Sequence, residues 1–124
     1  MKPLAAVLHN IQTQLDECDA EWCVFGSAAR QLAGERVAPN DIDIMMSMDG
    51  ERKAESLLAE WRTSVQLPES GKWTSRRSHY RMEGIDIDIS GGLMRRTPDG
   101  WKPVRPSEVH VKDGIRYATN LVDI

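Results

Sequence analysis

The segment VFGSAARQLAGERVAPNDIDIMM, residues 24–46, decides how this chain folds. It continues a short apolar run, Trp22–Phe25, whose composition is typical of a buried strand. The small residues Gly26 and Ser27 follow as a turn and lead into a helical pattern from Ala28 to Ala33. The pattern therefore predicts a strand, a glycine turn and a helix in direct succession.

The turn at Gly26 and Ser27 favours an anion site. A glycine lets backbone amides approach a ligand closely, and the N-terminus of the predicted helix points to the same place. Arg30 lies one turn into that helix, where it either reaches a bound triphosphate or only covers the helix with a solvent-facing charge. Both interpretations of Arg30 remain open.

The strand that follows has the strictly alternating sequence Asp41-Ile42-Asp43-Ile44. Because side chains on a strand alternate between its faces, Asp41 and Asp43 share one face and lie about 7 Å apart. Carboxylates held side by side repel each other unless a cation lies between them. Mg²⁺ suits such a pair, because it binds through one or two carboxylates and completes its coordination with substrate phosphates.

The loop between the helix and this strand is short. Gly34 is well placed to end the helix, and the residues up to Asn40 are too few to form another element. A βαβ-type connection would bring the glycine turn and the two aspartates together at one edge of the sheet.

These motifs resemble the signature of the DNA polymerase β-type nucleotidyltransferase superfamily. That signature is a hydrophobic strand, Gly-Ser or Gly-Gly, a helix, a spacer and then two acids that alternate with hydrophobic residues. Phe25-Gly26-Ser27 and Asp41-Ile42-Asp43-Ile44 match it here. The resemblance implies that the Gly-Ser turn holds nucleotide phosphates and that Asp41 and Asp43 bind catalytic metal ions.

A second acidic strand follows a predicted hairpin turn at Glu83-Gly84, with the sequence Ile85-Asp86-Ile87-Asp88-Ile89. Its isoleucines are expected in the core, and both aspartates face the other way. The resemblance implies a third metal-binding acid on a strand that pairs beside the first acidic pair. Asp88 fits that position in the pattern, and Asp86 stays an alternative because it points to the same face.

The flanking segments predict helices and a further strand. Apolar residues at helical spacing indicate a helix from Lys2 to about Cys18, and a similar face indicates a helix from Glu51 to Arg62. A short strand is expected from Ser64 to Leu67. The basic segment GKWTSRRSHYR, residues 71–81, fits either a clamp for a triphosphate or acceptor, or a half-buried edge strand protected by charge. The second interpretation is favoured.

The remaining residues suggest a loop-rich tail with little regular structure. Ser90-Gly91-Gly92 is expected to form a flexible turn, and the prolines between residues 98 and 106 favour loop. Two short strands, around residues 108–111 and 115–117, are expected to join at Asp113-Gly114.

Length and composition indicate one soluble domain that covers residues 1–124. The chain is 40% hydrophobic and 28% charged, with a formal net charge of -3, which gives no general support for nucleic-acid binding. No apolar run is long enough for a membrane span and no signal peptide is recognisable, so a cytoplasmic location is expected. Cys18 and Cys23 lack a zinc-site pattern and are interpreted as packing residues.

The predicted fold class is therefore α/β: a mixed sheet of about five strands with helices mainly on one side, as in the palm-like nucleotidyltransferase fold. The expected activity is metal-dependent transfer of a nucleoside monophosphate from a nucleoside triphosphate, such as ATP, to an unidentified acceptor hydroxyl, with release of pyrophosphate. Two Mg²⁺ ions would be bound by Asp41, Asp43 and Asp88.

Two alternatives stay open at this stage. The chain could be a weak or inactive binding module that needs a partner, as in a toxin–antitoxin pair, or its site could be completed by a second copy or a partner chain. Alternatively, the acids could form a structural or Ca²⁺ cluster, which would leave the Gly-Ser turn unexplained.

Overall fold

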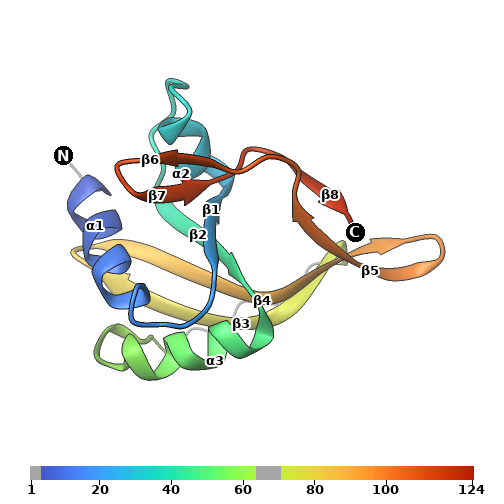
Figure 1. Cartoon of the computed structure of the whole chain (residues 1–124), viewed down its shortest axis with the longest axis horizontal. Coiled ribbons are helices and arrows are strands. Elements are labelled where there is room, and N and C mark those ends of the chain that lie inside the picture. Colours follow the sequence, from blue (N-terminus) through green and yellow to red (C-terminus); the bar gives the residue numbers. More distant parts are fainter. Residues whose placement is uncertain (1–3, 64–70) are drawn as a thin grey trace.

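The computed structural model describes residues 4–63 and 71–124 as a curved mixed sheet with helices packed against it (Figure 1). The helices are α1 (Leu4–Leu15), α2 (Gly26–Leu32), α3 (Met48–Leu57) and the short 3-10 helix η1 (Ala59–Trp61). The strands are β1 (Trp22–Phe25), β2 (Asp41–Met46), β3 (Trp73–Met82), β4 (Ile85–Thr97), β5 (Gly100–Pro106), β6 (His110–Lys112), β7 (Ile115–Tyr117) and β8 (Leu121–Asp123).

Strand β4 is the centre of the sheet. The strand order is β6-β7-β1-β2-β4-β5-β8, and β3 pairs with β4 along its other edge. The predicted mixed sheet with flanking helices is confirmed. Its expected size of about five strands is wrong, because the described residues form eight.

The two acidic strands lie side by side, as the resemblance implied. β2 and β4 are parallel, with Asp41 opposite Asp86 and Asp43 opposite Asp88. The predicted βαβ connection between β1 and β2 is wrong, since these strands pair antiparallel with Phe25 opposite Asp43. β2 begins beside the end of β1, so the segment that joins them, which contains α2, does not have to cross the sheet. β2 lies between β1 and β4, and its acids are therefore on an interior strand and not on an edge strand.

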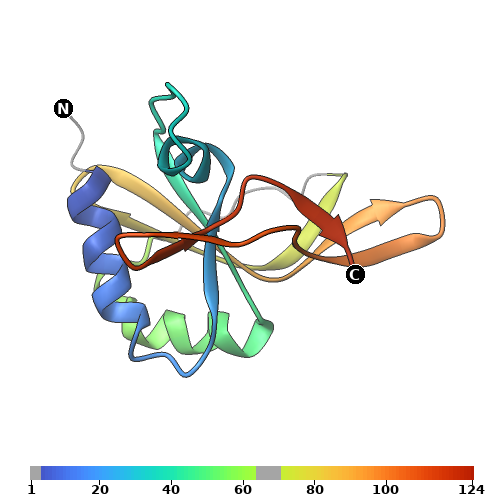
Figure 2. The same ribbon diagram turned by 45° about the horizontal axis from the view of Figure 1, so that its top comes forward.

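The main core lies between the helices and one face of the sheet (Figure 2). Isoleucines of β2 and β4 are fully buried there, namely Ile42, Ile44, Ile85, Ile87 and Ile89. α1 contributes its predicted apolar stripe, of which Val7, Leu8, Ile11 and Leu15 are buried. α2 adds Ala28 and Ala29 to the same core. Because the isoleucines alternate with the aspartates, the acids face away from this core.

Several boundaries differ from the sequence-based expectation. α3 begins at Met48, because Ser47 caps it by accepting a hydrogen bond from the Gly50 amide at 3.0 Å, and it ends at Leu57 before η1. Asp49-Gly50 therefore lies in the first turn of the helix. Residues 1–3 and the predicted strand from Ser64 to Leu67 lie outside the described residues.

The expected flexible turn at Ser90-Gly91-Gly92 is wrong, because all three residues lie inside β4. The prolines of residues 100–106 likewise do not prevent β5, which forms a hairpin with the end of β4. β5 pairs with β4 through residues 100–103 and with β8 through residues 104–106, and a strand segment that is paired on one side tolerates proline. The predicted pair of short strands around Asp113-Gly114 is confirmed as β6 and β7.

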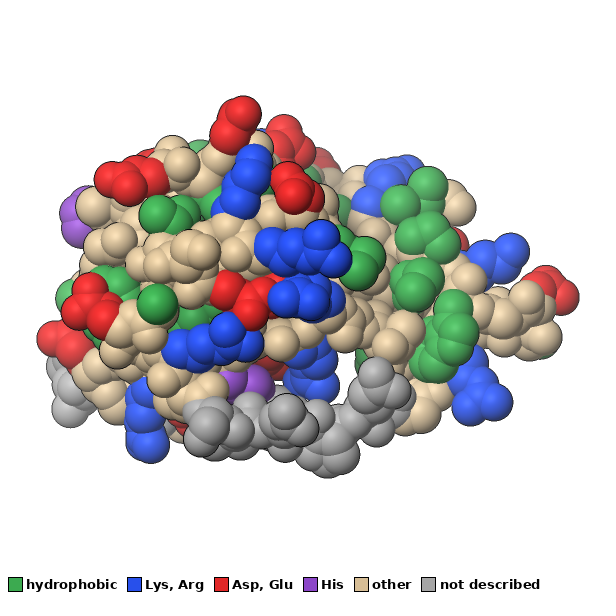
Figure 3. All heavy atoms as spheres, turned by 90° about the horizontal axis from the view of Figure 1, so that it is seen from below, with side chains coloured by type: hydrophobic (Ala, Val, Ile, Leu, Met, Phe, Trp, Pro, Cys, Tyr) green, Lys and Arg blue, Asp and Glu red, His purple; other side chains and the backbone are tan. Residues whose placement is uncertain are grey.

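Charged side chains of both signs are mixed over the face that carries α3, while hydrophobic side chains gather toward the β4–β5 end (Figure 3). Beneath these charges, Glu51 of α3 is fully buried and accepts a hydrogen bond from Nε of Arg76 at 2.8 Å. Arg76 also bonds Glu55 at 2.8 Å through Nη2. This network joins α3 to β3.

None of the helices among residues 4–63 and 71–124 combines the length and the hydrophobicity that a membrane span requires. α1, with 12 residues, is well short of the roughly 20 that cross a bilayer. The cysteines Cys18 and Cys23 are buried and free.

We expect Gly91→Ala to destabilise the fold by about 1–3 kcal/mol, because β4 passes directly under α3 at this position. A Cβ at residue 91 would lie 2.6 Å from Cβ of Glu51 and 3.2 Å from the backbone of Met48. Urea denaturation measures the free energy of unfolding. Gly71→Ala is the matched control, because a Cβ there meets no atom within 4 Å, and it should change stability by less than about 0.5 kcal/mol. Equal effects of the two substitutions would contradict this packing.

Candidate active site

The acids of β2 and β4 open into a pocket on the face of the sheet opposite the isoleucine core. The pocket has a volume of about 430 Å³, within the range of small-molecule sites. At one end it is lined by Gly26, Asp43, Arg77 and Asp88. The other end is formed mainly by apolar side chains from β1, β3, β4 and β8.

Asp43 and Asp88 are the two carboxylates inside the pocket. They occupy partner positions on adjacent parallel strands, so their backbones lie about 4.8 Å apart and their side chains point the same way. Asp41 and Asp86 form the next pair along the strands, and both are exposed. Asp86 lies near Arg81, with 3.8 Å between Oδ1 and Nε. The structure thus groups Asp43 with Asp88 and leaves Asp86 outside the pocket.

The expected turn at Gly26 and Ser27 is the first turn of α2, which begins at Gly26, and this turn lies directly against Asp43. Gly26 has a φ of +70° and a Cβ on it would lie 2.7 Å from Oδ2 of Asp43, so both the backbone angle and the space call for glycine. Ser27 follows in the first turn of α2 and is partly buried, and it is not part of the pocket lining. The antiparallel pairing of β1 with β2 creates this contact, because it sets Phe25 opposite Asp43.

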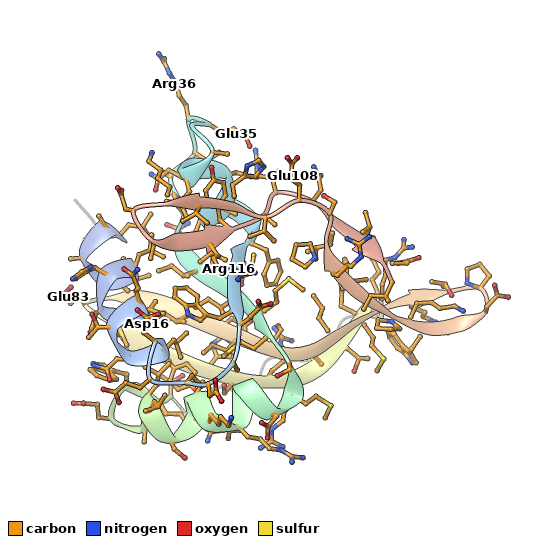
Figure 4. The ribbon with its side chains drawn as sticks, viewed as in Figure 1. Asp16, Glu35, Arg36, Glu83, Glu108 and Arg116 are labelled. Carbon is orange, nitrogen blue, oxygen red and sulfur yellow. The ribbon has the colours of Figure 1, made fainter. Side chains whose placement is uncertain are left out.

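Arg30 lies apart from the pocket. Its guanidinium bonds Oε1 of Glu35 at 3.3 Å, and both side chains are about half exposed. Glu35 and Arg36 stand at the tip of the loop after α2, away from the rest of the protein (Figure 4). The solvent-facing interpretation of Arg30 matches this position, and a phosphate contact would require the side chain to leave Glu35.

Two side chains of β3, Arg77 and His79, also belong to the site. Neither of them was named as a site residue from the sequence. Nη2 of Arg77 donates a hydrogen bond to Oδ2 of Asp88 at 2.8 Å. Nε2 of His79 lies 3.6 Å from Oδ1 of the same carboxylate, too far for a hydrogen bond. Both of these unpaired atoms, Nε2 of His79 and Oδ1 of Asp88, are buried.

The hairpin turn is the sequence feature from which the positions of Arg77 and His79 could have been predicted. A two-residue turn at Glu83-Gly84 pairs Met82 with Ile85 and thereby sets His79 opposite Asp88. Glu83 and Gly84 both have positive φ, of 48° and 79°, as the tight hairpin turn requires. The favoured interpretation of the basic segment as a strand is confirmed, and the same strand directs Arg77 into the pocket.

The charges of the site act most strongly on Asp43. The pKa of Asp43 is raised to about 7, chiefly by burial and also by the nearby carboxylates of Asp41 and Asp88, while Arg77 lowers it in part. Burial and like-charge repulsion both disfavour the ionised form, so the site is poised to accept positive charge.

The arrangement partly fits a divalent metal. Within residues 4–63 and 71–124, no three acidic, histidine or cysteine side chains converge closely enough to hold an ion by themselves. Asp43 and Asp88 nevertheless present hard oxygen donors side by side, and Oδ1 of Asp88 is a buried acceptor with no hydrogen-bond partner. Two carboxylates are what Mg²⁺ takes from a protein when substrate phosphates supply further oxygens.

We expect Asp43→Asn to stabilise the metal-free protein more at pH 8 than at pH 5. The folded carboxyl holds its proton up to about pH 7, whereas the unfolded one loses it near 3.8, so the stability of the native protein falls as pH rises through this window. The asparagine variant lacks this loss. Its free energy of unfolding should gain about 1–3 kcal/mol over the native protein between pH 5 and pH 8.

Urea denaturation in EDTA at the two pH values measures this difference. Asp86→Asn is the control, because that side chain is 57% exposed and lies outside the pocket, and its offset from the native protein should stay nearly constant. A constant offset for Asp43→Asn as well would show that Asp43 is ionised at both pH values.

Residues 7–110 match the family model of aminoglycoside-2''-adenylyltransferase. A comparison with curated protein sequences found no match.

Two solved structures share the fold. One is the crystal structure of a nucleotidyltransferase candidate from Thermotoga maritima, with 26% identity and a TM-score of 0.77 over 94% of this chain and 77% of that one. The other is the solution structure of the antibiotic-resistance factor ANT(2'')-Ia, with 14% identity and a TM-score of 0.61 over 97% of this chain and 66% of that one. The second likeness shows the fold alone.

Proposed function

The chain belongs to the aminoglycoside-2''-adenylyltransferase family, and we propose that it transfers the nucleoside monophosphate part of ATP to an acceptor hydroxyl and releases pyrophosphate. The observation that carries this proposal is the placement of Asp43 and Asp88 side by side against the Gly26 turn. Two carboxylates beside a close backbone approach suit a polyphosphate that arrives with a divalent cation.

The residues of this chain act mainly by position and charge. Asp43 and Asp88 would hold Mg²⁺, with exposed Asp41, two residues before Asp43 on β2, as a further acid nearby, and the metal would neutralise charge at the reacting phosphate. The Gly26 turn and the hydroxyl of Ser27 would support the β and γ phosphates. Asp88 would accept the proton of the acceptor hydroxyl. Most of the catalysis is then orientation and electrostatic stabilisation.

Arg77 supplies the positive charge of the pocket in the free protein. It donates a hydrogen bond to Oδ2 of Asp88, and its side chain is 29% exposed and lines the pocket. A guanidinium binds phosphate with the same paired donors that it offers to a carboxylate. We infer that Arg77 exchanges Asp88 for a phosphate oxygen when the nucleotide enters, which frees the carboxylate.

For the acceptor we infer a polyhydroxylated cation of the aminoglycoside type that the family description names. Asp41 and Asp86 are exposed and lie opposite each other on β2 and β4, where they would attract such a cation. The chain spans 77% of the length of one solved neighbour and 66% of the other.

Calorimetric titration with a non-hydrolysable ATP analogue tests the proposal. We expect binding in Mg²⁺ that is lost in EDTA, and a loss of at least tenfold in affinity for Asp43→Ala and for Asp88→Asn, because each removes a charged metal ligand. Asp86→Asn is the matched control, on the same strand and the same face as Asp88, and should bind within about threefold of the native protein.

The control also decides between the two candidates for the third acid. A loss with Asp86→Asn and none with Asp88→Asn would transfer that role to Asp86. If the native protein binds no nucleotide with Mg²⁺, the proposed transfer is contradicted and the binding module that depends on a partner is favoured.

A further inference from the structure

The pocket has a second half that the acids do not use. Beyond Asp43 and Asp88 its walls are formed by Phe25, Trp73, Leu93 and Leu121. They come from four different strands, β1, β3, β4 and β8. An apolar chamber that opens directly onto a pair of carboxylates suits a ligand with one flat apolar end and one highly charged end.

Specific contacts fix this apolar wall in place. Phe25 and Leu121 pack against the small buried cluster of Cys23, Met45 and Ala118. β8, which carries Leu121, pairs with β5 and is tied to β4 by two hydrogen bonds from Arg95 to Asp123, at 2.7 and 3.1 Å. The wall is therefore part of the sheet, and its spacing from the acids is set by strand pairing.

Trp73 is the largest side chain of the chamber. It is the first residue of β3. The same strand contains Arg77, which bonds Asp88, so Trp73 and Arg77 reach the pocket from one side. Trp73 is partly buried, and it lies close enough to Leu121 for the two to line a second hollow as well. An indole ring at a cavity wall offers a broad π surface for another flat ring.

We propose that this apolar half binds the purine base of the nucleotide and that Trp73 is the surface on which the base stacks. The inference rests on the proposed function, because the acids must hold the triphosphate for the base to extend toward Trp73. The competing occupant is the acceptor. A polyhydroxylated cation has little flat apolar surface and would lose hydration among Phe25, Leu93 and Leu121 without compensation.

Hydroxyl side chains occur among the apolar ones. Ser75, Ser90 and Thr119 also line the pocket, and Ser90 is itself buried. Each hydroxyl can donate one hydrogen bond and accept up to two, which suits the ring nitrogens and amino group of a base or the hydroxyls of its ribose. Stacking gives most of the affinity in such a site, and these groups would select among bases.

The test compares ATP with tripolyphosphate, which has the charge and no base. Affinities of the non-hydrolysable ATP analogue and of tripolyphosphate, both with Mg²⁺, are measured for the native protein, Trp73→Ala, Trp73→Phe and Trp101→Ala. Trp101 is the matched control, because it lies on β5, is 44% exposed and does not line the pocket. Thermal unfolding confirms that each variant is folded.

We expect Trp73→Ala to weaken ATP binding roughly tenfold and to leave tripolyphosphate binding unchanged, in line with the effect of removing one stacked aromatic residue. Trp73→Phe should retain most of the affinity. ATP should quench the tryptophan fluorescence of the native protein but not that of this variant. Trp101→Ala should match the native protein throughout.

Two results would overturn the inference. Equal ATP affinities of the native protein and Trp73→Ala would show that the base lies elsewhere while nucleotide binding, and with it the proposed function, stands. Equal losses of ATP and tripolyphosphate in Trp73→Ala would show that Trp73 only supports the fold of the pocket. Failure of the native protein to bind either ligand would instead remove the proposed function on which the inference rests.

Discussion

The parallel register of β2 and β4 is the constraint on which the site depends. Aspartate and isoleucine alternate on both of these adjacent strands, so the isoleucines on one face form the core and the aspartates on the other face form the acid pair. Full burial of an isoleucine stabilises the fold by about 1.5–3 kcal/mol, and the pair of strands buries several of them. Holding Asp43 ionised costs at most about 4 kcal/mol, given its pKa of about 7 against 3.8 in water. The core therefore outweighs the repulsion and keeps the carboxylates together.

β3 shows how one strand serves both the fold and the site. Successive arginines leave it on opposite faces: Arg76 bonds buried Glu51 of α3, and Arg77 bonds Asp88 in the pocket. On its outer side the strand forms an isolated bridge between Arg62 and Tyr80. The two interpretations of the basic segment, charged edge strand and ligand contact, thus describe different residues of the same strand.

The features that the sequence predicted well are local and periodic. Alternation at Asp41–Ile44 and Ile85–Ile89 is sufficient to assign each side chain to a face, and the turn at Glu83-Gly84 fixes the register of the hairpin. The errors arose where distant segments decide the outcome. Gly91 looks like a turn residue in sequence, but it is needed because α3 packs on β4 there. The antiparallel pairing of β1 with β2 and the contact of Arg30 with Glu35 likewise depend on where α2 and its loop lie in space.

We propose that a divalent cation and a nucleotide meet between Asp43 and Asp88. Paramagnetic broadening of backbone amide signals by substoichiometric Mn²⁺, in the presence of a non-hydrolysable ATP analogue, tests it most directly in a chain of 124 residues. We expect the broadening to be strongest at Gly26, Asp43 and Asp88. Broadening spread over exposed acids such as Asp16 and Glu108, with those three amides unaffected, would contradict it.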